Sequence, residues 1–113
     1  MRTPPPLNRK LMLEARGSEP DGGGGVVEGW TALGSHWAAV RAVSGREVLA
    51  GERPASRVTH EVVIRGAAPG SPRRPSADQR FRMGSRIFAI RGVAEADETG
   101  AWLRCWVEEG APS

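Results

Sequence analysis

Hydrophobic and polar residues alternate along much of the chain, which is the pattern expected of β-strands with one buried face. The clearest example is residues 57–65, where Val58, His60, Val62 and Ile64 share one face. The opposite face of this segment carries more polar side chains. We therefore expect a strand that packs its apolar face against the core.

Six further segments have a weaker form of this pattern and are also expected to be short strands: residues 10–16, 26–31, 35–43, 79–83, 86–93 and 101–108. The side chains expected to point inward are Leu11, Leu13, Phe81, Met83, Phe88, Ile90, Leu103, Cys105 and Val107. Residues 35–43, which include Trp37, have apolar side chains on both faces, which favours a strand covered on both sides. Seven short strands predict an all-β fold, a small antiparallel barrel or sandwich.

Chain-breaking residues divide these strands. Glycine and proline account for 24 of the 113 residues, a density that argues against a helical bundle. We expect long loops at residues 17–25, 44–56 and 66–78, with one or two helical turns inside the second loop as the only helix. Tight turns are predicted at Gly84 and at Gly100, where glycine tolerates a left-handed backbone.

The chain is long enough for one ordinary domain and too short for two. Three consecutive prolines near the start fix an extended backbone and supply no N–H groups. We therefore expect an extended arm over residues 1–8, a single β-barrel domain over residues 9–109 and a short tail over residues 110–113.

Charge is unevenly distributed along the chain, whose net charge is +3 with a pI of about 10.4. Residues 57–91 are basic and residues 92–113 are acidic, which suits head-to-tail contact between like subunits or a basic face near a polyanion. The arginines expected to lie near DNA or in an interface are Arg73, Arg74, Arg80 and Arg82. The acids expected in a subunit interface are Glu95, Asp97 and Glu98.

The residues that commonly carry catalysis or bind metals are few. Cys105 is the only cysteine, so no intrachain disulfide is possible, and it is expected to be buried on the core-facing side of its strand. His36 and His60 have no partners that would make a metal site or a catalytic pair. We therefore expect no catalytic residue, no metal, no cofactor and no enzyme activity. No segment is apolar enough to span a membrane, and the N-terminus lacks the apolar core of a signal peptide, so we expect a cytoplasmic chain.

Several short features follow one another along residues 7–109. They are the segments Leu7–Leu11, Asp21–Gly23, Trp30, Trp37–Ala38, Ser44–Glu47, Ile64–Arg65, Arg80–Phe81, Phe88–Ile90, Val93 and Glu108–Glu109. Their order and spacing resemble the phage head–tail joining family, the head-closure or stopper proteins of long-tailed phages and gene transfer agents. The loop at residues 66–78 is longer and more basic than the pattern of that family.

The resemblance implies a small β-barrel that forms a sixfold or twelvefold ring in a phage-like particle assembled in the bacterial cytoplasm. Such a ring would join portal and adaptor proteins on the head side to tail-terminator and tail-tube proteins on the tail side, around double-stranded DNA. By its position in the chain, the loop at residues 44–56 would gate the DNA channel. The residues concerned are Arg46, Glu47, Val48 and Leu49.

Two alternatives remain open at this stage. The chain could act at the same junction as an adaptor or a tail terminator. It could instead be a free β-barrel that binds nucleic acid without sequence preference, because its basic segment could neutralise phosphates. That second alternative lacks the exposed aromatic side chains, on which single-stranded bases stack, in the basic segment itself.

Overall fold

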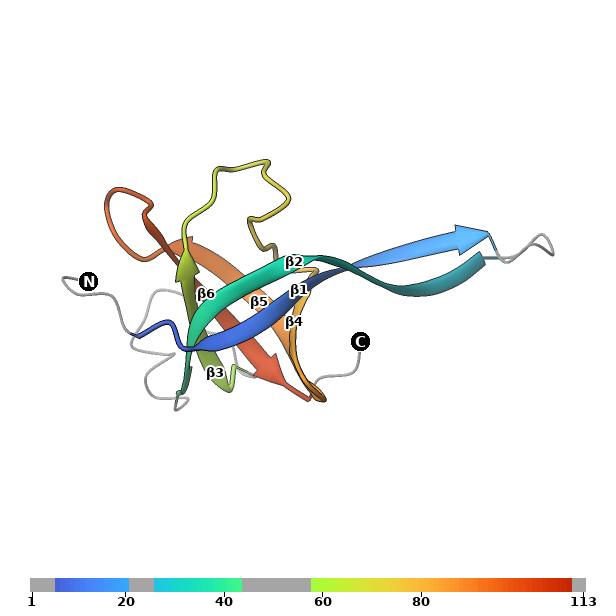
Figure 1. Ribbon diagram of the computed structural model, residues 1–113, viewed down its shortest axis with the longest axis horizontal. Coiled ribbons are helices and arrows are strands. Elements are labelled where there is room, and N and C mark those ends of the chain that lie inside the picture. The colour runs from blue at the N-terminus through green and yellow to red at the C-terminus, as the bar shows by residue number, and fades with distance from the viewer. Residues whose placement is uncertain (1–5, 21–25, 44–57, 111–113) are drawn as a thin grey trace.

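The computed structural model describes residues 6–20, 26–43 and 58–110. These residues form six strands and no helix: β1 (Arg9–Pro20), β2 (Val26–Ala42), β3 (His60–Arg65), β4 (Arg80–Met83), β5 (Arg86–Glu95) and β6 (Trp102–Glu109). All neighbours pair antiparallel in the order β1-β2-β3-β6-β5-β4, and β4 returns to β1 to close a barrel (Figure 1). The predicted all-β antiparallel barrel is confirmed. The expected helical turns and the 44–56 loop lie outside the described residues.

The barrel interior is filled by apolar side chains from all six strands. Alternation along each strand turns every second side chain inward, as the pattern in the sequence predicts. Met83 is only partly buried and packs against the edge of this core. The fully buried cluster comprises Leu11, Leu13, Ala38, Val62, Ile64, Phe81, Phe88, Ile90, Leu103, Cys105 and Val107.

The two strands expected at residues 26–31 and 35–43 are one continuous strand, β2. Its register against β1 shifts by one residue: Leu13 pairs with Gly34, and Glu14 pairs with Ala32. The extra residue between these pairs makes a β-bulge, and the φ of 137° at Gly34 is accommodated there because glycine has no Cβ. The sequence suggested a break at this point because a bulge interrupts the alternation without ending the strand.

The expected loop at residues 17–25 is also shorter than predicted, because β1 continues to Pro20 and pairs with β2 as far as Val26. β1 pairs with β4 only over Met12–Glu14, and β2 pairs with β3 only over Ala38–Ala42. Beyond those contacts the two strands pair only with each other. We call this projecting part, residues 15–20 and 26–31, the ribbon; it extends away from the barrel in Figure 1.

The predicted tight turns are present. Gly84 lies between β4 and β5 with a φ of 62°, and Gly100 lies before β6 with a φ of 72°. Both are backbone conformations that side chains with a Cβ rarely adopt. The loop at residues 66–78 and the turn at residues 95–101 lie on the same side of the barrel (Figure 1), and the Gly66 N–H donates a hydrogen bond to the Ala101 carbonyl at 2.7 Å.

Candidate functional site

The base of the ribbon is fixed by a charged cluster on the outer face of β1 and β4. Glu14 is only 5% exposed, although it points away from the apolar core. Its carboxylate accepts hydrogen bonds from Arg80 Nε at 2.7 Å and from Arg82 Nε at 2.9 Å. Burial alone would raise the pKa of Glu14, but the hydrogen bonds and positive charge of the two arginines outweigh it and hold that pKa below its ordinary value.

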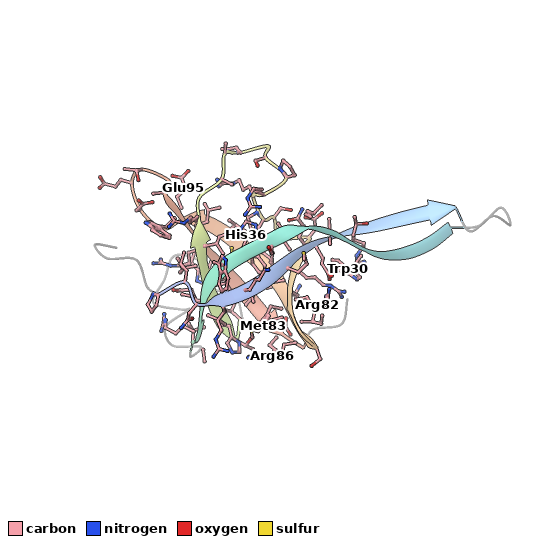
Figure 2. All side chains as sticks on the ribbon, in the orientation of Figure 1. Trp30, His36, Arg82, Met83, Arg86 and Glu95 are labelled. Atoms are coloured by element: carbon pink, nitrogen blue, oxygen red, sulfur yellow. The ribbon has the colours of Figure 1, made fainter. Side chains whose placement is uncertain are left out.

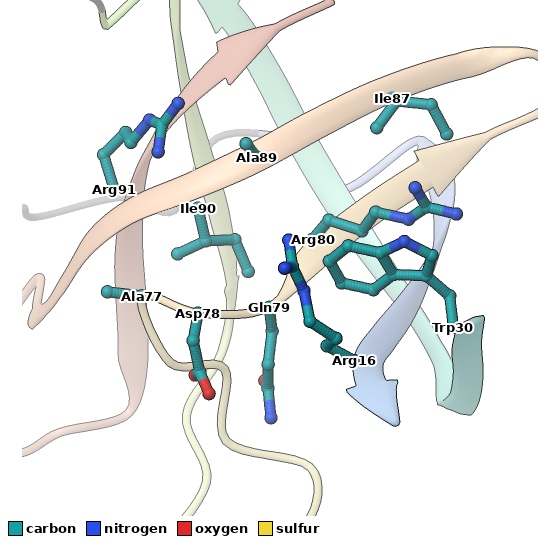
Figure 3. Close-up of a pocket in the computed structure, with 10 residues that line it drawn as sticks. All are labelled: Arg16, Trp30, Ala77, Asp78, Gln79, Arg80, Ile87, Ala89, Ile90 and Arg91. Carbon is teal, nitrogen blue, oxygen red and sulfur yellow. The ribbon is translucent and has the colours of Figure 1, made fainter. Parts of the chain in front are cut away.

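Trp30 of the ribbon packs against the same cluster. The Arg80 guanidinium lies 4.1 Å from the Trp30 ring centre, and the Arg16 guanidinium lies 5.2 Å from it. Both distances are within the range of cation–π attraction. A hollow of about 290 Å³ lies at this point. In Figure 3, Trp30 and the two arginines line one wall of it, and Asp78 and Arg91 lie further along. These contacts set the direction in which the ribbon leaves the barrel.

The four arginines predicted to lie near DNA or in an interface are all hydrogen-bonded within the chain. Arg80 and Arg82 meet at Glu14, as described above. Arg73 donates to the Ser35 carbonyl at 3.1 Å, and Arg74 donates to the Ala67 carbonyl at 3.0 Å. The structure therefore brings Arg80 and Arg82 together on one carboxylate and gives the other two separate structural contacts. Their predicted role in binding remains a prediction.

At the acidic end of the chain, Glu108 and Glu109 pair with arginines of the neighbouring strand β5. Glu109 accepts two hydrogen bonds from Arg86, at 2.7 and 3.0 Å, and this contact lowers the pKa of Glu109. Glu108 accepts two hydrogen bonds from Arg91, at 3.1 and 2.7 Å. Arginines of the basic segment and glutamates of the acidic segment thus lie on the adjacent strands β5 and β6, where their charges neutralise each other.

The predicted interface acids lie in and beside the turn between β5 and β6. Hydrogen bonds, first from Thr99 and then from backbone N–H groups that include Trp102, lower the pKa of Asp97. Glu95 and Glu98 are exposed. Figure 2 shows Glu95 and Trp30 at opposite sides of the barrel, so the acidic turn is separate from the ribbon base. The role of these acids in a subunit interface stays a prediction.

Nothing in the surroundings of Cys105 activates it as a nucleophile. Its side chain is buried in the core, and desolvation raises the pKa of the thiol to about 12, with only a weak opposing effect of Arg74. A thiolate is therefore absent at neutral pH. The expected burial of this residue is confirmed.

The histidines have structural contacts. His36 is buried edge-on against Phe81, and His60 packs edge-on against Phe88. Desolvation, followed by the charge of Arg73, lowers the pKa of His36, so this side chain is neutral at pH 7. Within the described residues no group of three His, Cys, Asp or Glu side chains is arranged to hold a metal ion. No helix in that part of the chain has the length and hydrophobicity needed to span a bilayer.

The sequence pattern of the phage head completion protein family matches residues 2–110. The chain belongs to this family. A chain in the virion of a native gene transfer agent particle is 43% identical to this chain, with a TM-score of 0.71, and the match covers 96% of this chain and 100% of that one. No curated protein matches the chain.

A second solved structure shares the fold alone. The solution structure of protein SF1141 from Shigella flexneri 2a is 21% identical, with a TM-score of 0.72, and the match covers 95% of this chain and 96% of that one. The family resemblance drawn from the sequence is thus confirmed over nearly the whole chain.

Two features of the chain were not predicted from its sequence. The first is the ribbon with Trp30 and Arg16 at its base; a long alternating run on both sides of a glycine-rich turn was the available signal. The second is Trp37, which was expected in a strand covered on both sides and is instead 58% exposed. Alternation along the strand does place Trp37 on the outer face, because the next residue, Ala38, is buried on the inner face. It does not show whether another element covers the outer face.

Proposed function

We propose that this protein is a structural ring component of the head–tail junction of a phage-like particle. The observation that carries the proposal is the end-to-end match, at 43% identity, to a chain of a gene transfer agent virion. Membership of the head completion protein family supports the same role. The role is structural, and the buried Cys105 and the packed histidines are consistent with a protein that performs no chemistry.

The shape of the subunit supports assembly into a ring. A closed barrel has no free sheet edges, so it can be repeated around an axis without uncontrolled strand pairing. The long loops and the ribbon are then available for contacts with neighbouring subunits and with portal, adaptor and tail proteins. By its position in the chain, the loop at residues 44–56, with Arg46, Glu47, Val48 and Leu49, is proposed to line and gate the DNA channel.

The acidic turn and the basic loop are proposed as contact regions of the ring. They lie beside each other on one side of the barrel, joined by the hydrogen bond between Gly66 and Ala101. A neighbouring subunit that binds this side of the barrel would therefore contact both the acidic turn and the basic loop. Charged groups at such a rim steer association and fix its register more than they strengthen it.

The proposal is tested by removing the gene from a producing strain and examining the particles by electron microscopy and mass spectrometry. We expect wild-type particles to contain the chain at the neck. Particles made without it should be heads that lack attached tails. Re-expression of the wild-type chain should restore tails, whereas a Phe88→Ala chain, which loses a core side chain, should not. Normal tailed particles without the chain would refute the proposal.

The alternative of a free nucleic-acid-binding barrel predicts a different result with the isolated protein. Fluorescence anisotropy with short double-stranded and single-stranded DNA at low salt measures it directly. Tight binding that falls steeply with salt, and that weakens when Arg73 and Arg74 are both changed to Ala, would favour the alternative. We expect only weak binding, because both side chains already donate hydrogen bonds within the chain.

A further inference from the structure

The ribbon is a two-stranded sheet without a third strand. Beyond Glu14 on β1, and before Ala38 on β2, no described strand pairs with the outer edges of the hairpin. An isolated two-stranded hairpin is only marginally stable in water, and its unpaired edges are suited to contact with another chain. A ribbon anchored at its base by Trp30 and left unsupported beyond it is therefore suited to binding a partner.

Beyond Arg16, which lies over Trp30 at the base of the ribbon, the sequence of residues 17–31 carries negative charge only. Between Arg16 and Arg41 there is no basic residue, and the acids there are Glu19, Asp21 and Glu28. The rest of the chain is strongly basic, since the whole protein has a net charge of +3. A partner for the ribbon should therefore present positive charge.

A surface of that kind lies on the outer face of the barrel, around the exposed Trp37. Lys10 of β1 pairs with Trp37 of β2, and Arg65 of β3 pairs with Trp102 of β6. Ala38 of β2 pairs with Ile64 of β3, so the next residues outward along these two strands are Trp37 and Arg65, and both are exposed. Lys10, Trp37, Arg65 and Trp102 thus form one cross-strand row of alternating cations and indole rings, which we call the cationic row.

The cations of this row are not neutralised within the subunit. Among the residues that the structure describes, neither Lys10 nor Arg65 forms an ion pair with a carboxylate. Arg65 instead lies over the Trp102 ring, 5.2 Å from its centre. Trp37 is 58% exposed, and it is the large apolar side chain most open to solvent in the described chain. Tryptophan and arginine are enriched among the residues that contribute most of the binding energy at protein interfaces.

The ribbon and the cationic row are separated along the long axis of the molecule. The ribbon projects from one side of the barrel, and β1 begins on the other side (Figure 1). Lys10 is the second residue of β1. One subunit therefore presents an acidic arm on one side and a basic aromatic surface on the other. Repeating such a contact generates a closed ring if the rotation between subunits closes.

We infer that the acidic ribbon of each subunit docks on the cationic row of the next subunit around the ring. The inference rests on the proposed function, because it names the partner of the ribbon within that ring. Trp37 supplies the apolar area that is buried, and Lys10 and Arg65 attract the acids of the ribbon and set its register. The bases of double-stranded DNA are stacked and cannot reach Trp37, so a second copy of the chain fits the row better than the DNA in the channel does.

The native protein is suited to cysteine cross-linking, because Cys105 is buried and its thiol pKa is about 12. Glu28→Cys and Lys10→Cys are introduced together, and purified particles are treated with a short bis-maleimide. Glu28 pairs with Ser18, which is eight residues along β1 from Lys10. That separation is roughly 26 Å at the rise of a β-strand, so a short linker joins only residues of different copies.

We expect a ladder of covalent oligomers of this chain from the double variant. Glu28→Cys with Ser85→Cys serves as the matched control, because Ser85 is exposed in the turn between β4 and β5 and lies outside the cationic row; it should give monomers. If the chain is present at the neck of tailed particles but the double variant gives no ladder, the inference is wrong and the proposed function stands. If Glu28→Cys is linked to a different particle protein, the ribbon has another partner and the inference is also wrong. If the chain is absent from the particles, the proposed function itself fails.

A charge exchange gives a second, independent test. Glu19→Arg with Glu28→Arg should lower tail attachment about tenfold, and so should Lys10→Glu with Arg65→Glu, since each removes two interfacial ion pairs. Combining all four changes should restore attachment toward the wild-type level. Circular dichroism of each isolated variant checks that the barrel is folded. Failure of the combined variant to recover, with all variants folded, would overturn the inference.

Discussion

The barrel and the ribbon are built from the same two strands, yet they are held together differently. Within the barrel, β1 and β2 each have two neighbouring strands, and their inward side chains join a core from which water is excluded. Beyond Glu14 on β1 and before Ala38 on β2, each strand pairs only with the other. Backbone hydrogen bonds are present in both regions, so what differs is the burial of apolar area, which is the main source of stability.

The comparison indicates how one short chain can combine a rigid body with a contact arm. The barrel is closed and has an apolar core of its own. The ribbon depends on Trp30 and the arginine cluster for its direction, and on another molecule for support along its length. Substitutions in the two regions should therefore affect different properties. Substitutions in the barrel core should affect the folding of the isolated chain, whereas substitutions in the ribbon or on the outer face should affect assembly.

The largest effect is expected from Phe88→Ala, which removes a fully buried ring from the barrel core. The free energy of unfolding should fall by about 3–5 kcal/mol. Urea unfolding followed by tryptophan fluorescence measures the loss. The matched change Trp37→Ala on the exposed outer face should cost less than about 0.5 kcal/mol in the isolated chain. Similar losses for both variants would remove the distinction between core and outer face.

A smaller loss is expected from Glu14→Gln at the junction of barrel and ribbon. Arg80 and Arg82 would lose their charged acceptor, which should cost about 2 kcal/mol at pH 7. Because the folded-state pKa of Glu14 is below its ordinary value of 4.5, its contribution is present above that pH and lost as the pH falls below it. The difference between wild type and variant in chemical unfolding should therefore shrink toward pH 3. Glu98→Gln, at an exposed site, should show neither effect.

A pair of glycine substitutions compares the two backbones directly. A Cβ at Gly66 would overlap the Gly100 carbonyl oxygen, whereas a Cβ at Gly29 in the ribbon would have no atom within 4 Å. We expect Gly66→Ala to destabilise the chain by about 1–3 kcal/mol and Gly29→Ala to change stability by less than about 0.5 kcal/mol. Thermal unfolding measures both. Equal effects would show that the ribbon is packed as closely as the barrel.

The smallest effect is a pH dependence from His36. Its folded-state pKa is lowered, so the unfolded chain binds a proton more readily, and stability should fall as the pH drops below the ordinary histidine value of 6.5. His36→Leu removes this pH dependence. The free energy of unfolding of the variant should therefore rise relative to that of wild type as the pH falls from 7.5 to 5. Parallel stability profiles for the two proteins would contradict a buried neutral His36.

Much of the fold followed from local patterns. The strands β3 to β6, their inward residues and the glycine turns were predicted correctly because one buried face imposes alternation and a left-handed turn selects glycine. The two strands expected at residues 26–31 and 35–43 were not predicted to be one strand, β2, because a bulge interrupts the alternation between them. Of the candidate site, the sequence identified Arg80 and Arg82, but their shared partner Glu14 lies 66 and 68 residues away and only the pairing of β1 with β4 brings them together.

The sequence by itself determined an all-β chain with one apolar core, a basic middle and an acidic end, because strand periodicity and charge are properties of local segments. Only the tertiary structure decided which charges neutralise each other, how far the ribbon projects and that Trp37 is left open to solvent. Those outcomes depend on which strands become neighbours when the barrel closes. Strand pairing joins residues far apart in the chain, and no local pattern encodes it.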